Sequence, residues 1–239
     1  MRVLAISTST PRGSAALVRD GEAVAAIAYV DLQGHAERIF QAIDAVLAQS
    51  GETRGSLDGL ACDVGPGSFT GVRVGVASTK GIALGLNLPL AGVVSLEAMA
   101  AAAFASGEAG PGDVVVAAID AKKGEIFAAA YDAAGGTLAA PCARALGPEA
   151  FSLVAPPAGG RIVVAGEVAE AMTLPPGCHR ARGATVDLPD AGWIGRLARV
   201  RLSRHAGWDP QTSGDDAVEP LYVRPPDATP PCPPGREVG

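Results

Sequence analysis

The chain has 239 residues, of which 48% are hydrophobic and 18% charged, and its formal net charge is −6 at pH 7. This composition excludes an intrinsically disordered chain, and the length suffices for one large or two modest domains with buried cores. The acidic balance is not that of a nucleic-acid-binding domain, which usually carries a basic face, so we expect no direct sequence-specific nucleic-acid binding.

Strands and helices alternate along the N-terminal half in the pattern of an α/β protein. Strands are predicted at 2–7, 15–18, 22–30, 57–64 and 90–94, and helices at 35–49, 71–86 and 95–105. The first two strands form a hairpin across a polar turn. Ser95 is predicted to cap the third helix.

A glycine-rich stretch, GPGSFTG at 65–71, connects the fourth predicted strand to the second predicted helix. Gly65 and Gly67 permit backbone angles that a Cβ forbids, and Ser68 or Thr70 can cap the helix that follows. Such a loop at a helix N-terminus can bind an anion through free backbone N–H groups. A tight turn that binds nothing is the alternative, and the stretch matches neither a P-loop nor a Rossmann fingerprint.

The opening pattern returns after a turn-rich linker at 106–112. The segment 114–120 copies the first strand, and Gly124 occupies the turn position that Gly13 has in the first copy. This duplication predicts two similar lobes. We expect an N-terminal lobe at 1–105, a smaller lobe at 113–224 that includes the C-terminal helix, and a Pro-rich disordered tail at 225–239.

The C-terminal part predicts a strand at 161–165 and a helix at 191–205. Four arginines share this helix, at positions 196, 199, 201 and 204. We interpret them as a solvated helix face, and a local basic patch is the alternative.

Four cysteines lie far apart and form no C-x-x-C pair, which argues against a zinc knuckle or a redox motif: Cys62, Cys142, Cys178 and Cys232. The sequence shows no signal peptide and no apolar run of about 18 residues. We therefore expect a cytoplasmic protein with reduced thiols and no membrane association.

Five motifs, in order along most of the chain, carry a resemblance to a known family. They are MRVLAISTST at 1–10, GHAERI at 34–39, GPGSFTGVRVG at 65–75, AAIDAKKGEIFAAAY at 117–131 and EPLYVR at 219–224. With these motifs the chain resembles the TsaB (YeaZ) family, which serves threonylcarbamoyladenosine synthesis on bacterial tRNA. The resemblance implies the two-lobed α/β fold of actin, Hsp70 and sugar kinases (ASKHA), with duplicated mixed sheets flanked by helices.

The resemblance also implies a non-catalytic accessory role. Such a protein binds a TsaD-like catalytic subunit and enables threonylcarbamoyl transfer to the adenosine beside the anticodon of tRNAs reading codons that begin with A. It implies further a TsaE-like ATPase in a ternary complex and a homodimer when the chain is alone. No cofactor of its own is expected, and ATP or ADP would sit at the interface with the partner. The alternatives are an autonomous ATP-dependent small-molecule kinase or ATPase of the same fold, and a metallopeptidase.

The first hairpin departs from the pattern of ATP-hydrolysing relatives. Proteins of the actin-like fold usually carry an aspartate there that orients the magnesium of ATP, whereas this chain has Ser7-Thr8-Ser9-Thr10. Hydroxyls can bond a phosphate but supply no charge for Mg²⁺, so we predict that independent ATP hydrolysis is lost. The candidate nucleotide contacts are Ser7, Thr8, Ser9 and the second-copy carboxylate Asp120.

No metal site is predicted. TsaD proteins hold their metal through an H-x-x-x-H pair, and here His35 is followed four residues later by Ile39. His179 and His205 have no carboxylate or cysteine partner at ligand spacing.

By resemblance, the partner interface is expected on the glycine-rich stretch and the helix after it. The candidate residues are Gly67, Ser68, Phe69, Thr70, Gly71, Arg73, Gly75, Ser78 and Ile82. Glycines 71, 75 and 85 share one helix face, and each costs the helix about 1 kcal/mol relative to alanine. Small side chains allow a second backbone to come close. We expect that backbone to belong to a helix of the partner, and the chain's own sheet or adjacent helix is the alternative.

Overall fold

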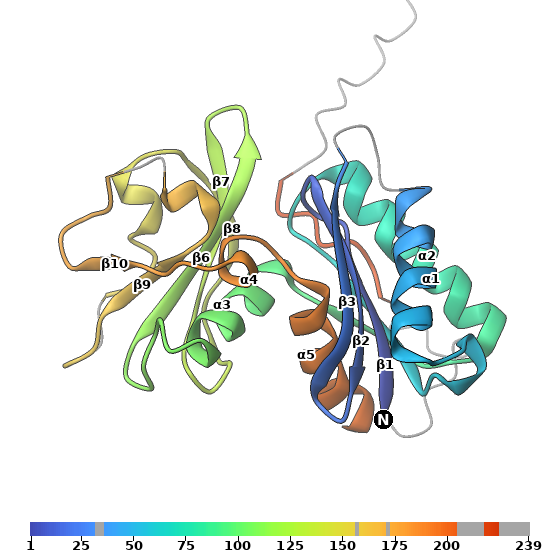
Figure 1. The fold of residues 1–239 in the computed structure, drawn as a ribbon. Helices are drawn as coiled ribbons and strands as arrows, with labels where there is room; N and C mark the ends of the chain where they lie inside the picture. The colour runs from blue at the N-terminus through green and yellow to red at the C-terminus, as the bar shows by residue number, and fades with distance from the viewer. Residues whose placement is uncertain (32–35, 156–157, 171–172, 205–217, 225–239) are drawn as a thin grey trace, which may run out of the picture.

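The computed structural model describes residues 1–31, 36–155, 158–170, 173–204 and 218–224. These residues form two lobes, each built around a five-stranded sheet (Figure 1). The predicted His35 and His205, and the predicted tail at 225–239, lie outside the described residues.

The first lobe contains a mixed sheet with the strand order β3-β2-β1-β4-β5. Its strands are β1 (Arg2–Ser7), β2 (Arg12–Arg19), β3 (Glu22–Val30), β4 (Gly59–Asp63) and β5 (Leu90–Val93). β1 pairs antiparallel with β2 and parallel with β4, so the first hairpin and the strand that leads to the glycine-rich stretch are neighbours. Helices α1 (Arg38–Ser50) and α2 (Phe69–Leu86) cover one face of this sheet.

The second lobe repeats this topology, with the strand order β10-β9-β6-β7-β8. Its strands are β6 (Val114–Lys122), β7 (Glu125–Tyr131), β8 (Thr137–Ala145), β9 (Ile162–Ala165) and β10 (Cys178–Arg180). The predicted duplication is therefore confirmed. Short 3₁₀ turns, η2 (Pro148–Phe151) and η3 (Glu167–Ala169), stand where the first lobe has α1 and α2. This loss of helices explains why the repeat fades in the sequence after its second strand.

Each of the two helices that connect the lobes packs against the sheet of the other half of the chain. α3 (Ser95–Ala105) follows the first sheet along the chain, but most of its buried residues belong to the core of the second sheet. α5 (Ala191–Arg204) follows the second sheet and packs against the first. The assignment of the C-terminal helix to the second lobe is therefore wrong, because chain order does not reveal which sheet a helix covers. The boundaries at 105 and 113 stay predictions.

The predicted strands and helices are otherwise confirmed to within a few residues. The short helices η1 (Arg54–Ser56) and α4 (Ala184–Asp187) and the strands β8 and β10 were not predicted. β8 was not predicted because it contains Pro141 and because apolar and polar residues alternate only weakly along it. Proline within a sheet is confined to edge strands, and β8 is an edge strand.

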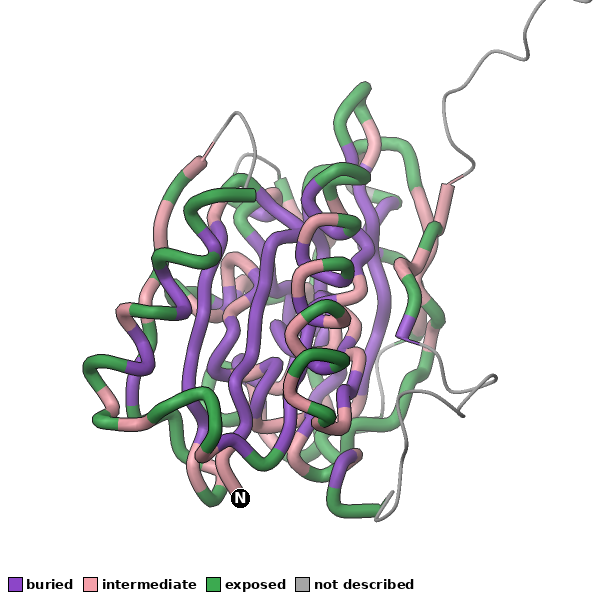
Figure 2. The backbone as a smooth tube through the Cα atoms, turned by 90° about the vertical axis from the view of Figure 1, so that its right-hand side faces the viewer, coloured by how far each residue is buried: buried purple, intermediate pink, exposed green. Residues whose placement is uncertain are grey.

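Both sheets are covered on both faces, and Figure 2 shows the central strands as buried along their length. β1 is buried from Val3 to Ser7, and β6 is buried from Val114 to Ile119. Many of the buried positions are alanines, in the strands and in α3. The core is therefore packed through small side chains at short distances, in which an added methyl group is strongly felt.

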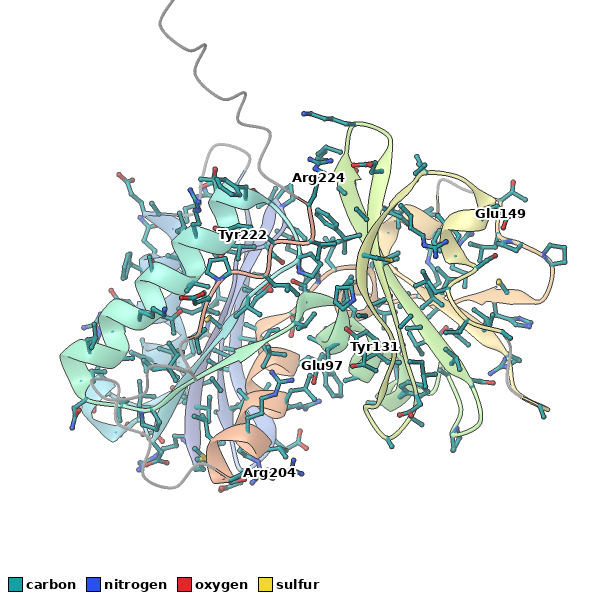
Figure 3. All side chains as sticks on the ribbon, turned by 180° about the vertical axis from the view of Figure 1, so that it is seen from behind. Glu97, Tyr131, Glu149, Arg204, Tyr222 and Arg224 are labelled. Carbon is teal, nitrogen blue, oxygen red and sulfur yellow. The ribbon has the colours of Figure 1, made fainter. Side chains whose placement is uncertain are left out.

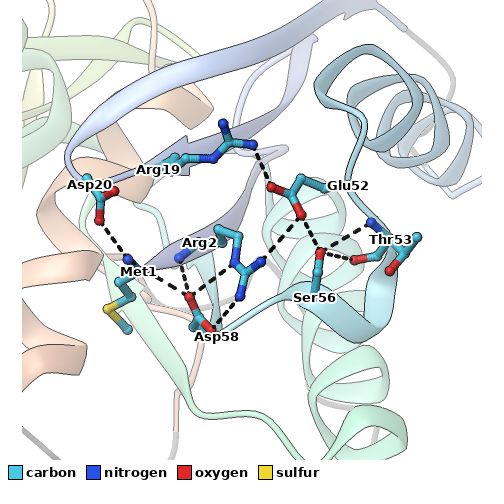
Figure 4. Close-up of polar contacts among 8 residues, drawn as sticks. All are labelled: Met1, Arg2, Arg19, Asp20, Glu52, Thr53, Ser56 and Asp58. Atoms are coloured by element: carbon cyan, nitrogen blue, oxygen red, sulfur yellow. Dashed lines mark hydrogen bonds and ion pairs between the residues drawn. The ribbon is translucent and has the colours of Figure 1, made fainter.

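A charged cluster closes the end of the first lobe at which β1 begins (Figure 4). Its members are joined by hydrogen bonds and ion pairs and are Met1, Arg2, Arg19, Asp20, Glu52, Thr53, Ser56 and Asp58. Such exposed pairs are worth about 0–1 kcal/mol each. The carboxyl ends of β1 and β4, and with them the glycine-rich stretch, lie at the other end of the sheet.

An ion pair between the buried Asp113 and the exposed Arg161 fixes the start of the second lobe. Asp113 accepts hydrogen bonds from the Arg161 guanidinium at 2.6 Å, from the Arg161 backbone N–H at 2.9 Å and from the Gly110 N–H at 2.8 Å. The hydrogen bond from Arg161 is the main reason why the pKa of Asp113 lies well below its usual range.

We expect Asp113→Asn to lower the free energy of unfolding by about 1–3 kcal/mol at pH 7, since hydrogen bonds to the charged carboxylate are lost. A depressed pKa contributes stability above the unfolded-state value of about 4 that is lost as the pH falls toward the folded-state value. The difference from wild type should therefore shrink in urea titrations below about pH 4. Asp44→Asn, in an exposed pair with Arg54, is the control and should cost under about 1 kcal/mol. A difference for Asp113→Asn that is unchanged at low pH would contradict the assignment.

Candidate functional site

The glycine-rich stretch is a rigid turn fixed from two sides. Gly65 has φ 95° and a cis peptide bond to Pro66. The Ser68 N–H donates to the Ser9 carbonyl at 2.6 Å, and the Ser95 N–H donates to the Gly65 carbonyl at 2.8 Å. The first hairpin and the start of α3 thus hold the turn between them.

Ser68 is the N-cap of α2, as one of the two predicted alternatives had it, and its hydroxyl accepts from the Gly71 N–H at 3.2 Å. The Gly65 N–H donates to Asp63 at 2.8 Å. Together with the Ser68 N–H, three backbone donors of this stretch are used within the chain. This arrangement favours the tight turn over the anion-binding loop.

Asp63, at the end of β4, is the centre of a buried polar cluster that the sequence did not single out. Its carboxylate is 1% exposed and accepts hydroxyl hydrogen bonds from Ser7 at 2.8 Å, Ser9 at 2.5 Å and Ser95 at 2.5 Å. Burial raises the pKa of Asp63, and the hydroxyl donors oppose that rise. The cluster joins β1, the turn after it, β4 and α3.

The hydroxyls of the first hairpin are therefore already engaged. Ser7 and Ser9 donate to Asp63, and the Thr8 hydroxyl donates to the Gly71 carbonyl at 2.7 Å. All three side chains are buried. Their prediction as nucleotide contacts is not supported by this geometry, because their hydroxyl protons point to groups of the chain itself. Ser95 does not cap α3 as predicted, since its hydroxyl is bound to Asp63.

Asp120, the fourth candidate nucleotide contact, lies near the tip of the β6–β7 hairpin. Its carboxylate accepts from the Lys122 ammonium at 2.6 Å and from the Lys122 backbone N–H at 2.7 Å. Despite partial burial, these contacts hold its pKa below the usual range. Asp120 is thus ionised and paired across its own turn.

The glycine face of α2 meets the chain itself, at least in its first turns. A Cβ added to Gly71 would lie 2.1 Å from the Thr8 carbonyl oxygen, and one added to Gly75 would lie 2.3 Å from the Thr8 hydroxyl. A Cβ on Gly67 would lie 2.2 Å from the Ser9 carbonyl oxygen. The turn after β1 thus occupies the space beside these three glycines, which favours packing within the chain. Their place in a partner interface stays a prediction. Gly85 has open space around it.

The other candidate residues of α2 divide between the core and the surface. Ser78 and Ile82 are half-buried, and Ile82 packs against the core of the first lobe. Ser68, Phe69, Thr70 and Arg73 are exposed. The outward face of α2, and not its glycine face, is the part that a partner could reach.

An aromatic and cationic cluster lies at the start of this outward face. The Arg73 guanidinium stands 3.7 Å from the centre of the Phe69 ring, and its Nε donates to the Tyr222 hydroxyl at 2.7 Å. The ring centroids of Phe69 and Tyr222 are 5.2 Å apart. Both residues are partly open to solvent, with exposed fractions of 42% for Phe69 and 45% for Tyr222. The sequence motif at 219–224 contains Tyr222 but does not indicate a role for this residue, because the residues that Tyr222 contacts lie about 150 positions earlier in the chain.

Two of the four arginines on α5 form ion pairs. Arg196 pairs with Glu22 at 2.7 Å, and Arg201 pairs with both oxygens of Glu97 at 2.7 and 2.6 Å. Arg199 lies beside Gly21, and Arg204 is exposed at the end of the helix (Figure 3). Because Arg201 also donates to the Gly92 carbonyl, its role is to hold α5 to the first sheet and to α3.

The described part of the chain has neither a metal-binding cluster nor a membrane-spanning helix. No group of three or more histidine, cysteine, aspartate or glutamate side chains there is arranged to hold a metal ion. Within the same ranges, no helix combines the length and the apolar character needed to cross a membrane.

Comparison with known proteins adds the family. A family model described as TsaD, tRNA N6-adenosine threonylcarbamoyltransferase, matches residues 30–174. The chain is 44% identical over 122 residues to the tRNA threonylcarbamoyladenosine biosynthesis protein TsaB of Haemophilus influenzae, and 41% identical over 122 residues to TsaB of Escherichia coli. These matches cover 51% of this chain and about half the length of each relative, 50% and 51%.

The fold comparison extends over nearly the whole chain. A solved structure of YeaZ from Pseudomonas aeruginosa superposes with a TM-score of 0.73 at 28% identity, covering 92% of this chain and 99% of that one. The fold of the chain is thus that of YeaZ, with the duplicated two-lobed architecture that the sequence motifs implied. The chain belongs to the TsaD family and, within it, to the TsaB (YeaZ) proteins.

Proposed function

We propose that this chain is a non-catalytic accessory subunit of a tRNA threonylcarbamoyltransferase complex. In this role it binds a TsaD-like catalytic subunit through the outward face of α2 and enables transfer of the threonylcarbamoyl group to the adenosine beside the anticodon. The membership among TsaB proteins supports a role in threonylcarbamoyladenosine synthesis. The observation that carries the proposal is the exposed cluster at the start of α2, in which Phe69 and Arg73 of the helix contact Tyr222.

The non-catalytic role is supported by the first hairpin. Ser7 stands where an ATP-hydrolysing relative would need a carboxylate, and its hydroxyl is used by the buried Asp63 at 2.8 Å. A kinase or ATPase of this fold needs a carboxylate that can reach a magnesium ion in solvent. Asp63 is enclosed, and Asp120 is paired with Lys122.

The outward face of α2 has the composition of a binding surface. Phe69 and Arg73 lie at its start, and Leu84, which is 58% exposed, lies near its end. Phe40 on α1, which covers the same face of the sheet, is also exposed. Aromatic residues and arginine at the centre of an interface carry most of the binding energy in many complexes. The same surface would serve a homodimer of the free chain.

The proposal keeps the wider assembly that the family resemblance implies. A TsaE-like ATPase would join the pair in a ternary complex, and ATP or ADP would bind at the joint with the TsaD-like subunit. The hydroxyls of Ser7, Thr8 and Ser9 are engaged within the chain, so the partner would supply most contacts to such a nucleotide.

We expect Leu84→Asp to weaken binding to the TsaD-like subunit at least about tenfold, because a carboxylate would be desolvated within the interface. Isothermal titration calorimetry would measure this binding, and reconstituted threonylcarbamoyl transfer would fall with it. Leu138→Asp is the matched control, since Leu138 is 47% exposed on the second lobe. Neither change should alter the melting temperature by more than a few degrees, since both side chains face solvent. Unchanged affinity of Leu84→Asp would show that this face is not the interface.

A further inference from the structure

Residues 218–224 run from the core of the first lobe to the hairpin of the second (Figures 1 and 3). Val218 is 9% exposed and belongs to the core cluster of the first lobe. The Leu221 N–H donates to the Val64 carbonyl at 2.7 Å, directly before the glycine-rich turn. At the other end, Arg224 donates to Glu125 at 2.6 Å. Seven residues thus connect the two lobes without belonging to a helix or a strand.

Neighbouring residues of this segment contact different lobes. The Tyr222 hydroxyl accepts from Arg73 of α2, and its ring packs beside Phe69. Val223 packs against the core cluster of the second lobe. The Leu221 carbonyl lies 3.3 Å from the place where a Cβ on Gly65 would stand, so the segment passes closely over the glycine-rich turn.

The other described connections between the lobes lie along α3, α4 and α5, and they include hydrogen bonds from Arg12 of β2 to the Ala184 carbonyl and to Asp190. The chain crosses between β5 and α3, Glu97 of α3 pairs with Arg201 of α5, and Trp193 packs against core clusters on both sides. Figure 3 places Glu97 and Tyr131 in the middle of the molecule and Arg224 near the tip of the β6–β7 hairpin. The lobes therefore have one contact line along α3, α4 and α5 and a second one at residues 218–224.

We propose that residues 218–224 form a clasp that holds the β6–β7 hairpin against the start of α2 and fixes the separation of the two lobes. A molecule with one line of contact between its lobes can open about that line, and a second line removes this freedom. Because Tyr222 packs against Phe69 and Arg73 on the outward face of α2, a protein that binds this face also covers the clasp and stabilises the closed arrangement. This last clause rests on the proposed function, whereas the clasp itself does not.

Hydrogen exchange of the full-length chain tests the clasp. The double variant Tyr222→Ala/Arg224→Ala removes its contacts to Arg73 and Glu125. Exchange should rise at least about tenfold for amides of the turn at 64–68 and of the hairpin at 122–127, because opening exposes both. Amides of α1, which packs over β2 and β3 rather than beside residues 218–224, should keep the wild-type rate. Glu219→Ala, exposed in the same segment, is the control and should behave as wild type.

Reversal of the charges of Arg224 and Glu125 distinguishes loss of this ion pair from general destabilisation of the chain. Arg224→Glu alone should raise exchange in the hairpin, and addition of Glu125→Arg should restore it, because the pair is rebuilt with opposite polarity. If exchange rises only within 218–224 and the turn and hairpin keep their wild-type rates, the segment is not a clasp. If the TsaD-like subunit binds without slowing exchange at these amides in the wild type, the coupling to α2 is wrong while the clasp stands. Failure of that subunit to bind at all contradicts the proposed function alone.

Discussion

Replacement of Gly71 by alanine should lower the free energy of unfolding by about 3 kcal/mol. The new Cβ would lie 2.1 Å from the Thr8 carbonyl oxygen, a distance that real Cβ atoms do not adopt. The obstructing atom belongs to the backbone, and the Thr8 hydroxyl donates to the Gly71 carbonyl, so the turn cannot shift without loss of that bond. Alanine has the higher helix propensity, yet the clash outweighs the gain of about 1 kcal/mol.

Gly81→Ala provides the matched control within the same helix. A Cβ at this position meets nothing within 4 Å, and the residue is exposed. Helix propensity then acts alone and should raise the free energy of unfolding by up to about 1 kcal/mol. Urea unfolding would measure the free energy of unfolding of both variants, and an m-value equal to that of wild type would show that the comparison is valid. If Gly71→Ala were as stable as wild type, the α2 glycine face would not pack against the first hairpin, and its assignment to a partner would return.

Replacement of Asp63 by alanine should cost about 3 kcal/mol or more. Four donors lose their acceptor: the hydroxyls of Ser7, Ser9 and Ser95 and the backbone N–H of Gly65. Each buried donor left without a partner costs about 1–3 kcal/mol, and rotation of the hydroxyls toward other acceptors recovers part of it. The glycine-rich turn and the start of α3 should loosen together, visible as faster hydrogen exchange at the Gly65 and Ser95 amides.

Asp63→Asn separates the hydrogen bonds from the charge. Burial raises the pKa of Asp63, so its contribution to stability is fully present below the unfolded-state pKa of about 4 and is lost as the pH rises through the folded-state value. Asparagine keeps one acceptor oxygen and no charge, so this variant should recover much of the loss at pH 7. Asp120→Ala, which removes an exposed carboxylate at the corresponding hairpin, should cost under about 1 kcal/mol. An Asp63→Ala protein as stable as wild type would show that the Asp63 cluster contributes little to the free energy of unfolding.

The sequence alone determined the local structure and the duplication. Apolar runs bounded by turn residues placed the strands, and helical periodicity placed α1, α2, α3 and α5. The return of the opening pattern at 114–120 predicted the second sheet, whose strand order repeats the first. These features depend on spacings of a few residues, which one sequence displays directly. The motifs also identified the family, because the central GPGSFTG stretch is highly specific.

The tertiary structure decided which surfaces these elements share. A stripe of small residues on α2 shows that something comes close but not what it is, and the close neighbour of Gly71 and Gly75 is Thr8, more than 60 residues earlier in the chain. Asp63 and Tyr222 were not predicted as site residues for the same reason, since the residues that they contact are far away in the sequence. Chain order likewise placed α5 on the second sheet, whereas it covers the first. Periodicity fixes the direction of each side chain relative to its own element, but the neighbour that buries it is chosen by long-range packing.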